Sequence, residues 1–159
     1  MKLIKLKDLM AQYGEYTISD ELIEKLQPPE ATTIWDLPYG DTYYYIDTEG
    51  NVTFDAWYES CKGERDVGNV FLTEEEALKD VERRKVETLL LRYNGRRWYK
   101  DGKENWFVTF DRSVGFLRYV YTVRDQRQGT IYFDTEKQAR QAVKDIGEEK
   151  IKSALFEVK

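Results

Sequence analysis

The sequence predicts an α+β protein: two tandem β-β-β-α units with antiparallel sheet, preceded by a short helical N-terminal segment. Three observations lead to this prediction. Aromatic and β-branched runs alternate with turn residues, two such stretches each end in a threonine placed to cap a helix, and the second stretch repeats the first at a shift of 62 residues. We divide the chain into an N-terminal segment (1–33), a first unit (34–91), a connector (92–102) and a second unit (103–159).

Two short helices are expected in the N-terminal segment. Apolar residues recur there with helical spacing, and Gly14 and the pair Pro28-Pro29 follow them as stop signals. Ser19 precedes the second helix as its N-cap. The apolar positions are Leu6, Leu9, Met10 and Tyr13 in the first helix and Leu22, Ile23 and Leu26 in the second.

The first unit begins with a predicted hairpin. Residues 43–46 and 52–57 are rich in aromatic and β-branched side chains, and the turn residues 47–51 separate them. A polar loop (59–66) and a short apolar strand (68–72) follow. Thr73 and Glu76 then form a capping box, which predicts a helix from Glu74 to Leu91. Its broad apolar face comprises Ala77, Leu78, Val81, Val86, Leu89 and Leu90.

The second unit repeats this order. Residues 105–111, 115–124 and 130–133 are strand-like, and Thr135 with Gln138 forms a second capping box. Gly147 separates the following helix from a last short helix. The apolar positions of these two helices are Ala139, Ala142, Val143 and Ile146, then Ile151, Ala154, Leu155 and Val158.

An internal duplication explains the repeated order. Among the residues that a shift of 62 aligns without gaps, seven identical pairs carry the comparison. They are Val52/Val114, Phe54/Phe116, Phe71/Phe133, Thr73/Thr135, Glu74/Glu136, Ala77/Ala139 and Val81/Val143. Two unrelated β-β-α segments can share apolar positions, but the matched caps favour a true repeat.

Composition excludes several classes of function. The chain has no histidine, which rules out imidazole catalysis and most zinc sites, and its single cysteine, Cys61, rules out an internal disulfide. No stretch of 18 apolar residues and no secretory leader is visible. We therefore expect a cytoplasmic protein without a membrane span. With no glycine-rich phosphate loop or defined carboxylate motif, we also expect no enzymatic activity, no metal and no cofactor.

Charge is distributed unevenly. Residues 41–91 carry 6 basic and 13 acidic groups, a net charge of −7, whereas residues 92–129 carry 9 basic and 4 acidic groups, a net charge of +5. The basic part contains the connector, where arginines alternate with aromatics. Such side chains contact phosphates and bases and also dominate protein interfaces. The candidate partner-binding residues are Arg96, Arg97, Trp98, Tyr99, Lys100, Arg124 and Arg127.

The acidic part offers a second candidate surface. A row of carboxylates can imitate a nucleic-acid backbone and dock into a basic channel, or can simply keep the protein soluble. The candidate acidic docking face comprises Asp55, Glu59, Glu64 and Asp66. Tyr43, Tyr44 and Tyr45 can form a stacking platform, although core packing accounts for one face of that strand.

Several segments together resemble a group of small, mostly uncharacterised proteins encoded by phages and prophages of Gram-positive bacteria. The segments are Trp35-Asp36-Leu37 and residues 40–46, 68–77, 131–139 and 146–152. The resemblance covers most of residues 35–156 and implies an accessory protein that acts in the host cytoplasm. Proteins of this kind include inhibitors of host defence, anti-CRISPR proteins among them. The resemblance defines no catalytic residue.

Three hypotheses of function follow. The first is a non-catalytic binding protein that inhibits a host protein, such as a defence nuclease or its complex. The second is a nucleic-acid-binding or regulatory module that uses the basic region 92–129, whose binding would weaken steeply with salt. The third is a sponge for a signalling nucleotide. The aromatic strands also leave an edge on which a second copy can pair, so a homodimer is possible.

Overall fold

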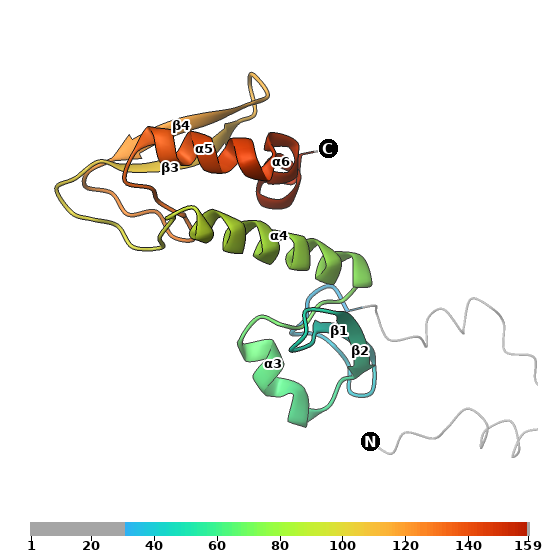
Figure 1. Cartoon of the computed structure of the whole chain (residues 1–159). Helices are drawn as coiled ribbons and strands as arrows, with labels where there is room; N and C mark the ends of the chain where they lie inside the picture. The colour runs from blue at the N-terminus through green and yellow to red at the C-terminus, as the bar shows by residue number, and fades with distance from the viewer. Residues whose placement is uncertain (1–30, 159) are drawn as a thin grey trace, which may run out of the picture. The chain divides into compact units, whose positions relative to one another are not determined.

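The computed structural model describes residues 31–158, and the described residues from Thr33 onward form one compact unit. The helices expected within residues 1–33 therefore lie outside the described residues. The fold is α+β, as predicted: four α-helices, one short 3-10 helix and two small antiparallel sheets of two strands each occupy the described part of the chain (Figure 1). In chain order the elements are β1 (Thr42–Ile46), β2 (Val52–Ala56), the 3-10 helix η1 (Glu59–Cys61), α3 (Lys62–Asp66), α4 (Glu74–Arg92), β3 (Asn105–Asp111), β4 (Phe116–Thr122), α5 (Glu136–Ile146) and α6 (Glu148–Phe156).

The two units share one topology. Each has a β-hairpin, then a segment that pairs with the first strand through a single β-bridge, then a helix that starts with a capping box. The bridges join Tyr44 to Phe71 and Trp106 to Phe133, which are equivalent positions at the shift of 62 residues. Both predicted capping boxes are formed. The third strand expected in each unit is thus reduced to one bridged residue.

The strand register corrects part of the ungapped alignment. Tyr44 lies opposite Phe54 in the first hairpin, whereas its equivalent Trp106 lies opposite Tyr121 in the second. The counterpart of Phe54 is therefore Tyr121 rather than Phe116. The second hairpin has strands of seven residues instead of five, so Val52/Val114 and Phe54/Phe116 match by coincidence.

The alignment of the two units at a shift of 62 residues holds again further along the chain. Residues 59–66, expected as a polar loop, form η1 and α3. Neither helix carries a fully buried residue, so no apolar periodicity marks them in the sequence. The extra residues between β2 and Phe71 offset the shorter hairpin of this unit, and the shift returns to 62 at Phe71.

Helix α4 packs on both units with opposite faces. Ala77 and Val81 are buried on the half that follows the first hairpin, while Val86 and Leu90 belong to the core of the second unit. Nine residues separate Ala77 from Val86, and at about 100° per residue this places them on opposite sides of the helix. The single broad apolar face predicted for this helix is therefore wrong, and Leu78 is exposed.

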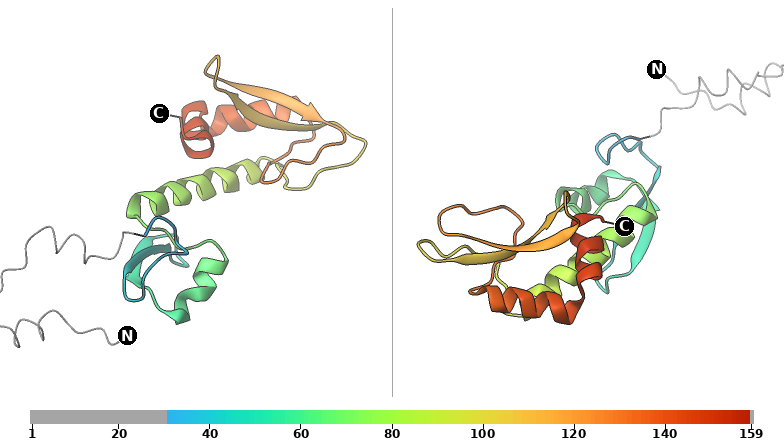
Figure 2. Two further views of the ribbon diagram at one scale, coloured as in Figure 1. Left: turned by 180° about the vertical axis from the view of Figure 1, so that it is seen from behind. Right: turned by 90° about the horizontal axis from the view of Figure 1, so that it is seen from above.

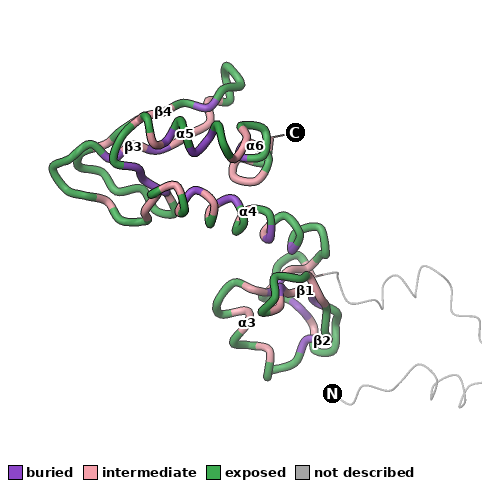
Figure 3. The backbone as a smooth tube through the Cα atoms, in the orientation of Figure 1, coloured by how far each residue is buried: buried purple, intermediate pink, exposed green. Residues whose placement is uncertain are grey.

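The main core lies in the second unit. Helices α5 and α6 pack against α4, and α5 covers one face of the β3–β4 hairpin (Figure 2). Buried positions follow β3 and α5 in Figure 3. Gly147 has φ +99°, a conformation that favours glycine, and it lets α6 start directly after α5. The fully or largely buried residues of this core are Val86, Leu90, Leu117, Ile131, Phe133, Ala139, Ala142, Val143 and Ile151.

Candidate interaction surface

The connector leaves α4 in tight contact with the second unit. A side chain at Gly95 would place its Cβ 2.5 Å from the Leu90 carbonyl oxygen and 2.7 Å from Ile131 Cγ2, so only glycine fits. The next residue, Arg96, exchanges two backbone hydrogen bonds of 2.8 Å with Tyr132. The start of the connector is therefore fixed by close packing at Gly95 and by backbone hydrogen bonds at Arg96.

A buried amide holds the other end of the connector. Asn105, the first residue of β3, is fully buried. Its Oδ1 accepts hydrogen bonds from Arg96 Nη2 (2.7 Å) and from the Lys100 backbone N–H (2.8 Å). Its Nδ2 donates to the carbonyl oxygens of Lys100 (2.8 Å), Lys103 (2.7 Å) and Thr122 (3.3 Å). One side chain thereby fixes the backbone of the whole loop.

Trp98 projects from this fixed loop with 77% of its surface exposed. Its neighbours Arg97 and Lys100 are both about half exposed, and each forms an ion pair with an acid of the same chain. Arg97 pairs with Glu87 at 2.5 Å, and Lys100 pairs with Asp134 at 2.9 Å. Close to the exposed indole in the sequence, Arg97 and Lys100 are therefore each already paired with an acid of the same chain.

The Arg96 side chain is part of the scaffold and is mostly buried. It is only 14% exposed, and it also lies 3.3 Å from Asp134. The hydrogen bond from Lys100, with the charge of Arg96, holds the pKa of Asp134 below its ordinary value. Arg96 and Asp134 therefore tie the connector to the segment that precedes α5, and the Arg96 guanidinium is not displayed to a partner.

Tyr99 and Arg127, two of the remaining predicted binding residues, contact Tyr132. The Tyr99 ring is half-buried against the Tyr132 ring, with their centroids 6.2 Å apart, and burial raises the pKa of Tyr99. The Tyr132 hydroxyl accepts a hydrogen bond of 2.6 Å from the Arg127 backbone N–H. The Arg127 guanidinium stacks 4.9 Å from the Phe107 ring centroid, and Arg124 is exposed. The connector and the loop after β4 therefore meet on the same side of the second unit.

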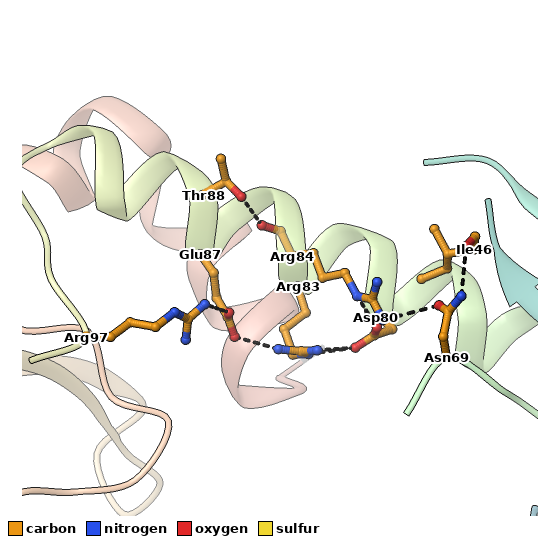
Figure 4. Close-up of polar contacts among 8 residues, drawn as sticks. All are labelled: Ile46, Asn69, Asp80, Arg83, Arg84, Glu87, Thr88 and Arg97. Atoms are coloured by element: carbon orange, nitrogen blue, oxygen red, sulfur yellow. Dashed lines mark hydrogen bonds and ion pairs between the residues drawn. The ribbon is translucent and has the colours of Figure 1, made fainter. Parts of the chain in front are cut away.

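A chain of ion pairs along α4 links the connector to the first unit (Figure 4). Glu87, which binds Arg97, also pairs with Arg83, and Arg83 and Arg84 both pair with Asp80. Arg84 donates a hydrogen bond of 3.3 Å to the Asn69 side chain. Asn69 in turn donates one of 2.8 Å to the Ile46 carbonyl oxygen. Because the two acids are largely buried, this network is part of the scaffold.

The predicted acidic docking face belongs to the first unit. Asp55 lies on β2, Glu59 on η1, and Glu64 and Asp66 on α3. Three of these side chains are exposed, but Glu64 is half-buried and accepts a hydrogen bond of 2.6 Å from the Tyr43 hydroxyl. Tyr43 is buried, and burial together with this bond raises its pKa. Glu64 therefore has a packing role beside any role in docking.

Two features of the site were not predicted from the sequence. Asn105 looks like an ordinary polar residue at the start of a strand, and nothing in the local pattern marks it as buried. Arg65 stacks between Trp35 and Trp57, with its Cζ atom 4.6 and 4.8 Å from the two ring centroids. The excess of tryptophan in a small chain is the signal that points to such stacking.

A cleft of about 180 Å³ lies between α4, β3 and α6. Its walls are mostly apolar, and its two charged residues, Arg83 and Glu87, pair with each other. Ligand pockets usually enclose about 300–1,000 Å³, so this cleft is smaller than a typical ligand pocket. Its lining includes Leu90, Val108, Ile131, Phe133, Leu155 and Phe156.

Comparisons with protein-family models, with curated proteins and with solved structures find no match to this chain. Among residues 31–158, no helix is both long and apolar enough to cross a bilayer. The same part of the chain contains no group of three or more cysteine, aspartate or glutamate side chains placed to hold a metal ion.

Proposed function

We propose that this protein is a binding protein that acts by occupying the surface of a partner protein, and that Trp98 is the anchor of its binding surface. The single observation that carries the proposal is an exposed tryptophan on a loop whose backbone is fixed by a buried asparagine. The resemblance to phage accessory proteins suggests a host protein as the partner, with a component of a defence nuclease as the first candidate.

Rigidity of the loop supports this proposal. Association orders flexible side chains and loops at a cost of about 0.5–1.5 kcal/mol for each immobilised side chain. The connector is held by Asn105 and by the Arg96–Tyr132 bridge before any partner arrives. Tryptophan is also the residue type most enriched at energetic centres of interfaces. A fixed loop that displays an indole is therefore suited to binding a preformed apolar pocket.

The charge pattern favours a protein partner over nucleic acid. Phosphate binding uses cations that release counterions, but Arg96, Arg97 and Lys100 are all paired with acids of the same chain. A rim of paired charges around an apolar centre is typical of protein interfaces. Nucleic-acid binding through Arg124 and Arg127 stays as the alternative outcome of the test.

The test is a pull-down of the tagged protein from a Gram-positive host lysate, with and without nuclease. The variant Trp98→Ala removes the anchor. Tyr39→Ala is the matched control, because Tyr39 is equally exposed, at 76%, on the first unit. We expect the parent and Tyr39→Ala to retain the same host protein after nuclease treatment, and Trp98→Ala to lose it.

Two results would contradict the proposal. Retention by Trp98→Ala equal to that of the parent would remove the anchor role. Recovery that disappears with nuclease, and that weakens by orders of magnitude between about 50 and 200 mM salt, would establish the nucleic-acid alternative instead.

A further inference from the structure

Strand β4 is the outer strand of the second sheet. Its partner β3 pairs with β4 on one side and bridges to Phe133 on the other, so β3 is central and β4 has one unpaired side. Among residues 31–158, no strand lies beyond β4 on the side away from β3 (Figure 1). An uncovered strand of this kind presents a row of backbone donors and acceptors to another chain.

The bridge to Phe133 determines which backbone groups of β4 point outward. Trp106 uses both its N–H and its C=O with Phe133, at 3.0 and 2.7 Å. Trp106 and its cross-strand partner Tyr121 are therefore a non-hydrogen-bonded pair of the β3–β4 ladder. Since the pattern alternates, the N–H and C=O groups of Leu117, Tyr119 and Tyr121 point away from β3.

Apolar side chains on and beside this strand are also exposed, although the Tyr121 ring contacts Trp106 on β3 with the centroids 5.0 Å apart. Four of the large apolar residues that are exposed in the described structure lie within residues 114–123. They include Phe116, which is 63% exposed, and Tyr121, which is 52% exposed. The one charge in this stretch is Arg118, and Asp111 on β3 neutralises it at 2.6 Å. The other two exposed apolar residues are Val114 and Val123.

The equivalent edge of the first unit provides an internal contrast. Strand β2 occupies the same position in its hairpin, but it has five residues instead of seven and carries Asp55, whose side chain is exposed. Natural proteins protect exposed edges with short strands and charges. The duplicated fold therefore protects one edge in this way and leaves the other long, apolar and electrically neutral.

We propose that β4 pairs with β4 of a second copy, antiparallel, about a two-fold axis through Tyr119. In this register Tyr119 faces itself, and Leu117 faces Tyr121 of the second copy. All three residues point their backbone groups outward, so each finds an outward-pointing partner, and the pairing is self-complementary as a two-fold interface requires. The neutral strand also allows two chains of net charge −5 to approach each other. This interface does not use Trp98 and is independent of the proposed function.

The first test is the mass in solution, measured by light scattering on a sizing column over a hundredfold range of concentration. We expect the full chain to reach twice its mass of 18.9 kDa. Tyr121→Pro removes an outward N–H without touching the β3 ladder and should give a monomer. Tyr121→Thr loses the same ring but keeps the N–H and a β-prone side chain, and it should remain a dimer. A monomeric parent, or a dimer that Tyr121→Pro leaves intact, would overturn the proposal.

The second test fixes the register and does not depend on the proline variant folding. In a Cys61→Ser background, Tyr119→Cys places two cysteines opposite each other on the axis, and mild oxidation should link them. Val123→Cys is the control, because residue 123 lies eight residues from its copy in this register, about 26 Å away. Equal cross-linking of both variants, or of the control alone, would refute the two-fold pairing about Tyr119.

Discussion

Replacement of Asn105 by alanine should destabilise the protein more than any other polar substitution in the connector region. The side chain is fully buried and joins Arg96, Lys100, Lys103 and Thr122 through five hydrogen bonds. Alanine would leave these groups without a partner inside the fold. The connector would then lose the contacts that fix its shape, and Trp98 would no longer be held in place.

The magnitude follows from the bond count. A neutral hydrogen bond contributes about 0.5–1.5 kcal/mol to stability and a bond to a charged group about 1.5–3 kcal/mol. The amide has two hydrogens for its three acceptors, so we count two donated bonds, one accepted from Lys100 and one accepted from the charged Arg96. The expected loss is about 3–7 kcal/mol, a large part of the 5–15 kcal/mol typical of a domain.

The assay is urea unfolding of the full chain, followed by far-ultraviolet circular dichroism. Asn69→Ala is the matched control, because Asn69 is a half-buried asparagine whose side chain makes two hydrogen bonds, one donated to the Ile46 carbonyl oxygen and one accepted from Arg84 at an exposed position. Because the second bond is exposed, the loss of both should cost about 1–2 kcal/mol. If Asn105→Ala lowers the free energy of unfolding by no more than Asn69→Ala, the reasoning about the connector is wrong.

Three further predictions concern the same body. Gly95→Ala should lower the urea midpoint by an amount that corresponds to about 1–3 kcal/mol, because the new Cβ meets the Leu90 carbonyl oxygen and a side chain opposite it; an unchanged midpoint would contradict this. Thr135→Ala should cost about 1 kcal/mol in the same measurement, since it removes the cap of α5, while Thr135→Ser should cost little. The lowered pKa of Asp134 means that its stabilising effect is present above its ordinary value of 3.8 and is lost as pH falls through the folded value. Stability should therefore fall less steeply below about pH 4 in Asp134→Asn than in the parent, and parallel curves would rule out this linkage.

Local signals in the sequence were sufficient for most of the secondary structure. Thr73 and Thr135 cap helices as predicted, and the predicted helix from Glu74 ends at Arg92, one residue later than expected. The first hairpin also forms where aromatic and β-branched residues predict it. These features depend on neighbours within a few residues, which is why a single sequence reveals them.

Features that depend on distant contacts were not predicted. Aligning the two hairpins requires a gap of five residues. This gap becomes visible only in the strand pairing, where Trp106 lies opposite Tyr121. Helix α4 buries two opposite faces because each half packs on a different unit. The apolar pattern of the whole helix, interpreted as one face in the sequence, conceals the change of face between the halves. The short helix α3 has no apolar pattern of its own, and packing around Arg65 determines its position.

The candidate surface was predicted in part. The sequence identified the connector and its mixture of aromatics and cations, and Trp98 is exposed there. The sequence did not separate Arg96, which is held inside the fold by Asn105 and Asp134, from Arg97, which remains half exposed. Only tertiary contacts distinguish a scaffold arginine from a surface arginine, because both have the same local sequence pattern.

Site-specific photo-cross-linking tests the central claim most directly. A photoreactive phenylalanine analogue placed at position 98 in the host cell should capture one partner protein, and the adduct should survive nuclease treatment. The same analogue at Tyr39, which is equally exposed, should not capture that protein. Capture of the same partner at position 39 but not at position 98 would contradict the assignment of Trp98 as the anchor.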